Sequence, residues 1–120
     1  MNRRLNIVLI LLAISAILVG FYFWHKNNSR VSVTVIVTDN GFEPETIQIE
    51  KGTEVVFKNS GTQPHWPASD FHPTHGIYPE FDPQKPVSPG QSWVFRFNKK
   101  GSWNYHDHLK PDRLGVIKVE

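Results

Sequence analysis

Hydrophobic and polar residues alternate along most of the chain after residue 30. In 31–38, valine occupies every second position, which is the two-residue period of a β-strand with one buried face. Turn residues separate such segments, and no amphipathic helical period is present after residue 30, so we predict an all-β fold, an antiparallel β-sandwich. Its other strands are predicted around the alternating residues Ile47 and Ile49, Val55 and Phe57, and Trp93, Phe95 and Phe97, and in 103–108 and 115–120.

The segment 64–89 breaks this pattern because it carries seven of the nine prolines. Proline removes a backbone donor and fixes φ, so we predict an irregular loop with at most a short strand near its start. A loop this long in a small domain is usually functional. We expect its aromatic residues to cover one end of the sandwich: Trp66, Phe71, Tyr78 and Phe81.

A different pattern precedes the strands, because the twenty residues 5–24 carry no charge. A helix of this length is about 30 Å long, enough to cross the hydrocarbon core of a bilayer. A cleaved signal peptide has an apolar region of only about 7–15 residues and a small-x-small cleavage site, so we favour an uncleaved anchor over a signal peptide. No cysteine is present to carry a lipid. We therefore divide the chain into an anchor with its tether, 1–30, and a domain, 31–120.

Charge bears on location and on partners. Arg3 and Arg4 give the anchor a basic start, and such an anchor usually exports the domain attached to its C-terminal end, so we place the domain on the extracytoplasmic side of the cell membrane, held by a single span. The pI of 9.0 is misleading because four of the 13 Lys and Arg residues flank the apolar segment. The domain itself carries nine of them against 11 acidic residues and has no basic stripe, which argues against a nucleic-acid partner.

The run 103–108, Trp-Asn-Tyr-His-Asp-His, holds the densest group of chemically active side chains. If the strand continues to its end, alternation places Asp107 on the core side with Tyr105, and His106 and His108 on the opposite face. If the strand frays after Tyr105, the three polar side chains could converge instead. The sequence leaves both possibilities open.

Three motifs resemble the cupredoxin family: GFxPxxIxIxxGxxVxFxN at 41–59, a histidine at position 65, and GSWxYHxHxxPxxxGxIxV at 101–119. The resemblance spans nearly all of 31–120. Its C-terminal motif is the more specific part and is also similar to the last domain of multicopper oxidases. The resemblance implies a Greek-key β-sandwich in which an early His, a Cys, a later His and usually a Met hold a blue copper ion.

Carried over position by position, the resemblance aligns the early His with His65, the Cys with Asp107, the later His with Lys110 and the Met with Arg113. A blue copper site needs a thiolate, and this chain has no cysteine, so electron transfer of that type is excluded. For Lys110 and Arg113 we expect surface charge pairs with Asp107 or Asp112.

Histidine and carboxylate side chains nevertheless cluster in one part of the domain, and imidazole suits Cu(II) and Zn(II). One arrangement uses His65 and Asp107 at the position of the family's copper. In the other, which we favour, the outward-facing histidines of 103–108 meet the histidines of the proline-rich loop. The metal ligands are expected from His65, His72, His75, His106, Asp107 and His108.

These residues lead us to expect a divalent metal ion, Cu(II) or alternatively Zn(II), bound for copper handling or as an accessory to an envelope metalloprotein. The alternative is a metal-free interaction module whose proline-rich loop docks on an envelope partner. We do not expect an enzyme, because a hydrolytic metal site needs an open position and a general base. Asp70 or Glu80 could serve as that base, yet nothing in the sequence fixes either there.

Overall fold

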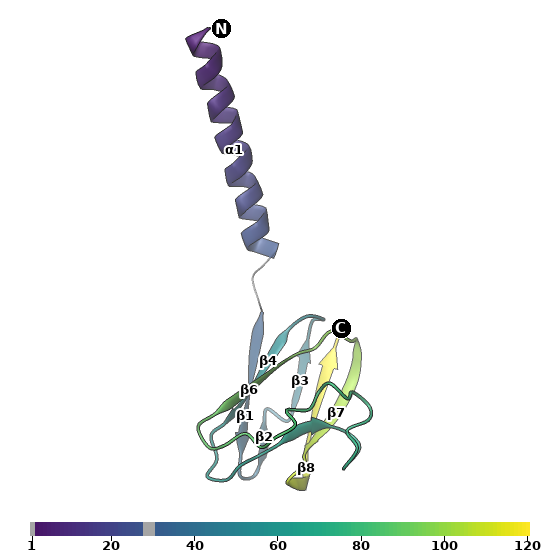
Figure 1. The fold of residues 1–120 in the computed structure, drawn as a ribbon. Helices are drawn as coiled ribbons and strands as arrows, with labels where there is room; N and C mark the ends of the chain where they lie inside the picture. The colour runs from purple at the N-terminus through teal and green to yellow at the C-terminus, as the bar shows by residue number, and fades with distance from the viewer. Residues whose placement is uncertain (1, 28–30) are drawn as a thin grey trace. The chain divides into compact units, whose positions relative to one another are not determined.

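The computed structural model describes residues 2–27 and 31–120. The chain forms two units, Met1–Arg30 and Val31–Glu120. Within the described residues, the first unit holds one helix and the second holds eight strands (Figure 1).

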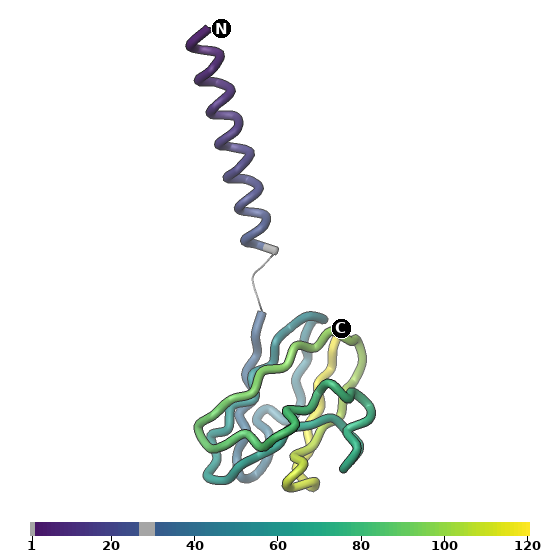
Figure 2. Tube along the Cα trace, viewed as in Figure 1, coloured from purple at the N-terminus to yellow at the C-terminus, as the bar shows by residue number. Residues whose placement is uncertain are grey.

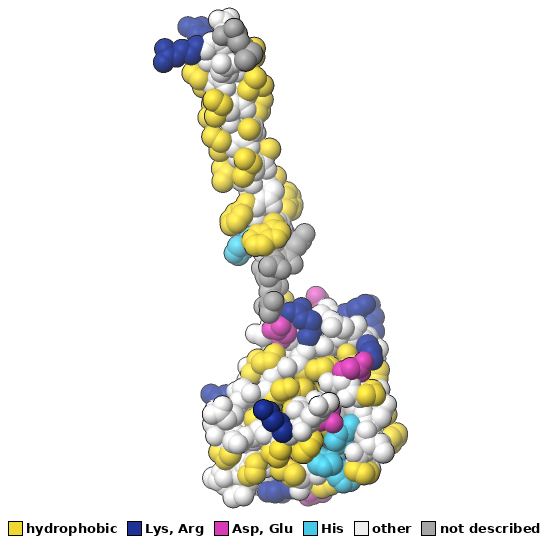
Figure 3. All heavy atoms as spheres, viewed as in Figure 1, with side chains coloured by type: hydrophobic (Ala, Val, Ile, Leu, Met, Phe, Trp, Pro, Cys, Tyr) yellow, Lys and Arg dark blue, Asp and Glu magenta, His cyan; other side chains and the backbone are white. Residues whose placement is uncertain are grey.

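Helix α1 comprises Arg3–Asn27. Its described side chains are exposed along nearly the whole helix, and Figure 3 shows apolar side chains along it. The stretch Arg3–Lys26 is long and apolar enough to cross a membrane. A helix with an apolar surface on all sides is typical of a segment that leaves water. By length and composition, α1 is therefore a candidate membrane anchor or signal sequence.

The second unit is a sandwich of two four-stranded sheets, as the alternation predicts. One sheet has the strand order β2-β1-β4-β6 and the other has the order β3-β8-β7-β5 (Figure 1). The strands are β1 Ser32–Thr38, β2 Gly41–Glu43, β3 Thr46–Ile49, β4 Glu54–Asn59, β5 Pro67–Ser69, β6 Ser92–Arg96, β7 Gly101–Asp107 and β8 Lys110–Val119.

The antiparallel expectation needs a correction, because both sheets are mixed. Strand β1 runs parallel to β4, and β3 runs parallel to β8, whereas the other pairs are antiparallel. The chain path explains the parallel pair in the first sheet. After the β1–β2 hairpin the chain crosses to the second sheet as β3 and returns as β4, so no hairpin forces β1 and β4 into opposite directions.

Aromatic rings dominate the core between the sheets. Phe57, Phe81, Phe97 and Tyr105 are fully buried, and the ring of Phe81 lies within 5.5 Å of the other three ring centroids. Burying a side chain of this size stabilises the fold by roughly 2–3 kcal/mol. Every member of the core cluster lies within 31–120, so this unit contains a complete hydrophobic core.

The proline-rich segment 64–89 holds only the short strand β5, as predicted, and otherwise runs across the sandwich without regular structure (teal to green in Figure 2). Its residues Tyr78 and Phe81 are buried in the core. For Phe71 the expectation is wrong, since its side chain is 70% exposed. The reason is that Asp70 and His72, on either side of it, both turn toward His106.

Candidate metal centre

The end of β7 separates its side chains by alternation, as expected for a strand that does not fray. Asp107 is buried and contacts His65, whereas His106 contacts Asp70 and His72. Strand β5 pairs alongside, with Ala68 opposite His106. The strand therefore presents two separate polar groups, one from each of its faces.

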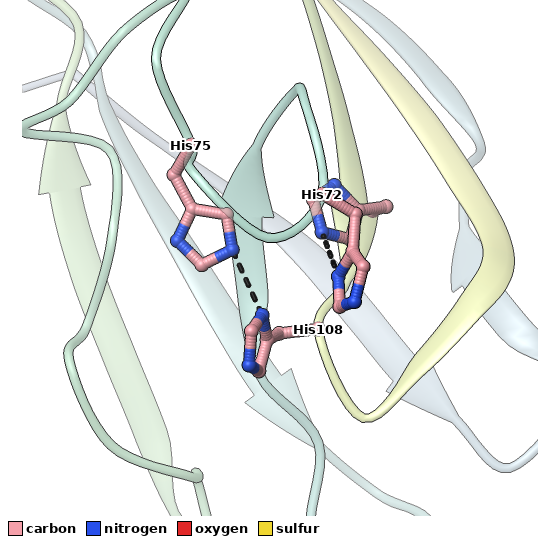
Figure 4. A group of neighbouring side chains, drawn as sticks. His72, His75 and His108 are labelled. Carbon is pink, nitrogen blue, oxygen red and sulfur yellow. Dashed lines mark hydrogen bonds between the residues drawn. The ribbon is translucent and has the colours of Figure 1, made fainter.

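Four histidines meet beside the end of β7. His106 and His108 come from the end of this strand and the turn after it, and His72 and His75 come from the loop after β5. One ring nitrogen from each lies within 4.8 Å of the others. Nδ1 of His72 is 3.3 Å from Nε2 of His106, and Nε2 of His75 is 2.9 Å from Nδ1 of His108 (Figure 4). Of the two arrangements considered from the sequence, the second is the one in which the histidines converge.

A tight turn directs His75 into this cluster. The backbone N–H of His75 donates to the carbonyl of Phe71 at 2.7 Å, and His75 itself has a φ of 54°, in the left-handed region that histidine enters more readily than most residues. The buried hydroxyl oxygen of Ser69 lies 2.8 Å from the carbonyl oxygen of His75 and 2.9 Å from that of Tyr78, and its single proton is shared between them. These bonds hold the loop against β5.

Two aspartates orient the two buried histidines. Nδ1 of His106 is 2.9 Å from Oδ1 of Asp70, and Nδ1 of His75 is 2.7 Å from Oδ2 of Asp82. When Nδ1–H donates to a carboxylate, the proton is fixed there and the lone pair of Nε2 is free for a metal ion. In both residues Nε2 is the atom that faces the cluster. The aspartates thus set the tautomer that metal binding requires.

Trp66 links two members of this arrangement. Its Nε1–H donates to Oδ1 of Asp82 at 2.8 Å, its ring centroid lies 4.7 Å from that of His108, and its carbonyl accepts the N–H of His108. Burial raises the pKa of Asp82, but the hydrogen bonds from His75, the backbone of Gln84 and Trp66 outweigh it, so the pKa is lowered. Asp82 therefore stays ionised and remains an acceptor.

The surroundings favour the neutral form of two of the histidines. Burial lowers the pKa of His106, and the nearby Asp70 offsets this only in part. Burial also lowers the pKa of His108, and the neighbouring imidazoles of His75, His72 and His106 lower it further. Neutral imidazole is the form that binds metal ions.

The four nitrogens are close enough to share one ion. A metal–nitrogen bond of about 2.0–2.1 Å allows two nitrogens on the same ion to lie at most about 4.2 Å apart. The widest spacing in the cluster, 4.8 Å, must therefore shorten by at least about 0.6 Å, which small side-chain rotations can supply. A donor set made only of imidazole suits Cu(II), Zn(II) or Ni(II).

The cluster lies just below the surface and is open along one edge. His75 and His106 are 5% and 1% exposed, whereas His108 is half-buried and His72 is exposed. Figure 3 shows histidine side chains gathered in one patch on the face of the domain.

His65 and Asp107, the other predicted ligands, form a separate group. Nδ1 of His65 is 2.6 Å from Oδ2 of Asp107, and its Nε2 is 3.1 Å from Oδ1 of Asp39. The second oxygen of Asp107 accepts the backbone N–H groups of Trp66 and Leu109. Because the two ring nitrogens of His65 point in opposite directions, the two carboxylates lie on opposite sides of the ring and do not surround a common point. The structure does not bring His65 or Asp107 into the histidine cluster.

Asp39, which the sequence did not single out, fixes a neighbouring turn. Its carboxylate accepts the backbone N–H groups of Thr62 and Gln63 and the hydroxyl of Thr62. These bonds, led by those from Thr62 and joined by one from His65, hold its pKa well below the usual range. Gly61 is needed here because a Cβ would lie only 3.0 Å from the backbone nitrogen of Asp39 and closer still to its side chain.

The structure also places the other charged residues that were considered from the sequence. Arg113 pairs with Asp112 at 3.0 Å, which is the surface pair expected from the sequence. Lys110 lies opposite Asp107 in the β7–β8 ladder, but in the described part of the chain no ion pair joins Asp107 to either cation. Of the two carboxylates considered as general bases, Asp70 bonds to His106 and Glu80 pairs with Lys99.

Comparison with known proteins places the domain in a family. The family model of the cupredoxin-like domain matches residues 10–119. The structure is similar to that of a purple cupredoxin from Nitrosopumilus maritimus, with a TM-score of 0.64 and 22% identity, covering 73% of this chain and 99% of that one. It is also similar to a reduced amicyanin mutant, with a TM-score of 0.65 and 20% identity, covering 74% of this chain and 82% of that one. No curated protein sequence matches the chain. At these identities the structural likeness shows the fold alone.

Proposed function

Since this chain belongs to the family of cupredoxin-like domains, we propose that it binds one divalent metal ion through His72, His75, His106 and His108. The observation that carries this proposal is the convergence of four imidazole nitrogens within 4.8 Å of one another. Two of these rings are already held by aspartates in the tautomer that a metal ion requires.

Copper(II) is the metal that this donor set favours, with zinc(II) as the alternative. A site of given ligands binds Cu(II) more tightly than Zn(II) or the earlier divalent metals of the same row. The ligands themselves are neutral, and Asp70 and Asp82 place two negative charges directly behind them, which matches a doubly charged cation. Soft sulfur donors, which would favour Cu(I), are absent because the chain has no cysteine and its single methionine is residue 1.

The proposed role is metal handling, or service as an accessory to an envelope metalloprotein, and not electron transfer of the blue-copper type. The family's thiolate position is occupied by Asp107, whose carboxylate is bonded to His65. Four protein ligands also leave no open position for a substrate, so we propose binding without catalysis.

We further propose that α1 is an uncleaved membrane anchor and that the domain lies on the extracytoplasmic side. The length and apolar surface of α1 support the anchor, and the basic residues at its start support this orientation.

A second candidate, a metal-free interaction module, is favoured by a different feature. A cleft of about 360 Å³ lies along the end of the proline-rich segment, lined by Pro83, Pro86 and Trp93 among others. Phe71 is also largely exposed. If this second candidate is correct, the four histidines pack the proline-rich loop against the end of β7 and bind no metal ion.

Titration of the full chain in detergent micelles with Cu(II) and with Zn(II) distinguishes the two candidates. We expect calorimetry to give one ion per chain, retained after dialysis, and the double variant His106→Ala, His108→Ala to lose it. His25→Ala, which removes a histidine outside the domain, is the matched control and is expected to bind as the natural chain does. Failure of the natural chain to bind either ion stoichiometrically at micromolar concentration would refute the metal proposal and favour the interaction module.

A further inference from the structure

The four histidines of the cluster differ in burial and in hydrogen-bond partners. His106 is 1% exposed and His75 is 5% exposed. Each also bonds through Nδ1 to its own aspartate, at 2.9 and 2.7 Å. These two rings are fixed by burial and by a charged partner, so they form the permanent half of the site.

His108 is held less strongly but is still supported. It is half-buried, its ring packs on that of Trp66 with centroids 4.7 Å apart, and its Nδ1 lies 2.9 Å from Nε2 of His75. Its backbone N–H is bonded to the carbonyl of Trp66.

His72 is the exception. Its side chain is exposed, and its polar contact is the 3.3 Å approach of Nδ1 to His106. Among the described residues, no carboxylate is bonded to His72, in contrast to His75 and His106. Residues 71–74 are exposed one after another, so rotation of the His72 side chain into water breaks its contacts with the rings of His106 and His108 but no bond to a carboxylate.

We propose that His72 is an exchangeable ligand through which the site passes its metal ion to or from a partner that presents a histidine side chain. This inference rests on the proposed metal site, and it assigns that site a role in metal transfer. The exchange is a ligand substitution without electron transfer: the bond from the ion to His72 breaks as a bond from the ion to the partner's imidazole forms. His75, His106 and His108 hold the ion during the exchange, and the open edge of the cluster lies on the side of His72.

The test compares His72→Ala with His106→Ala in the full chain in micelles, with Cu(II) as the metal and free imidazole in place of the partner. For His72→Ala we expect one Cu(II) per chain with a lowered affinity, faster release to an added chelator, and recovery of the slow release when imidazole is added. For His106→Ala we expect loss of stoichiometric binding that imidazole does not restore. Circular dichroism establishes that both variants are folded.

The outcomes separate the two proposals. If the natural chain binds no metal, the metal site itself fails and the transfer role fails with it. If the natural chain binds Cu(II) but folded His72→Ala loses the ion as completely as His106→Ala, or releases it no faster than the natural chain, the metal site stands and the exchange role of His72 is overturned.

Discussion

Nδ1 of His65 lies 2.6 Å from Oδ2 of Asp107, and both side chains are 1% exposed. By the resemblance to cupredoxins, these are the positions of the early histidine and the cysteine that hold copper in that family. Here the histidine bonds to the carboxylate of Asp107, and its other nitrogen faces Asp39. The contact joins β7 to the segment before β5, so the two residues that the resemblance aligns with copper ligands form a buried, hydrogen-bonded contact.

Replacement of His65 by alanine should therefore destabilise the domain without removing the metal ion. Asp107 would remain buried with only backbone partners, and loss of one partner of a buried pair costs on the order of 3 kcal/mol. Urea unfolding of fragment 31–120 measures the stability, and calorimetry at low temperature measures the stoichiometry, which should remain one. A folded His65→Ala variant that binds no metal would favour the arrangement in which His65 and Asp107 are ligands.

Substitution of an aspartate behind the cluster should lower the affinity for the metal ion but leave the number of ions bound per chain unchanged. Asp82→Asn keeps the size of the side chain but removes the charge that holds Nδ1–H of His75, and changes of this kind cost about 10–100-fold in metal affinity. Asp112→Asn is the matched control, because Asp112 is exposed and pairs with Arg113. An Asp82→Asn variant with unchanged Cu(II) affinity would show that Asp82 does not orient His75 in the metal-bound state.

Acid should destabilise the metal-free domain. The folded-state pKa values of His106 and His108 are lowered from 6.5, mainly by burial, so the unfolded chain takes up protons first as the pH falls. Their contribution to stability is therefore complete above about pH 6.5 and is lost as the pH falls below it. Unfolding free energies of fragment 31–120 at about pH 8 and about pH 5 measure the effect. Equal or greater stability at the lower pH would contradict it.

Gly115 should be intolerant of a side chain. It lies opposite Tyr105 in the β7–β8 ladder, and a Cβ there would lie 2.6 Å from the hydroxyl oxygen of Tyr105 and closer still to its ring. The buried ring packs on Phe42 at 4.6 Å and cannot easily move. We expect Gly115→Ala to lower the free energy of unfolding by about 1–3 kcal/mol. Gly76→Ala is the control, since its Cβ would make only an ordinary contact with Thr74, and an equal loss in both variants would contradict the steric explanation.

The strands could be predicted because the two-residue period is a local property of the sequence. Valine alternation at 31–38 corresponds to β1, Ser32–Thr38. The same period gave opposite faces for Asp107 and His106 as one of two possibilities, and the structure has this one. The parallel pairing of β1 with β4 could not be predicted in this way, because alternation reports which face is buried and not which strand lies alongside.

The roles of Asp82 and Trp66, which support the histidine cluster, could not be predicted from the sequence pattern either. Asp82 is a single carboxylate in the proline-rich segment, without a periodic or spacing signal, and it gains its role from His75, which the fold brings beside it. Asp39, which lies outside the histidine cluster, gave no such signal either. Trp66 was expected to cover the sandwich end, yet it connects Asp82 with His108. Such partners are set by loop paths, which local sequence rules describe poorly.

The location of the ion is the most direct test of the metal site. Crystals of fragment 31–120 grown with Cu(II) would show it by anomalous diffraction at the copper absorption edge. We predict one peak within bonding distance of His72, His75, His106 and His108, and none beside His65. A peak between His65 and Asp107, or crystals of the copper-soaked fragment with no ordered peak at the cluster, would contradict the assignment.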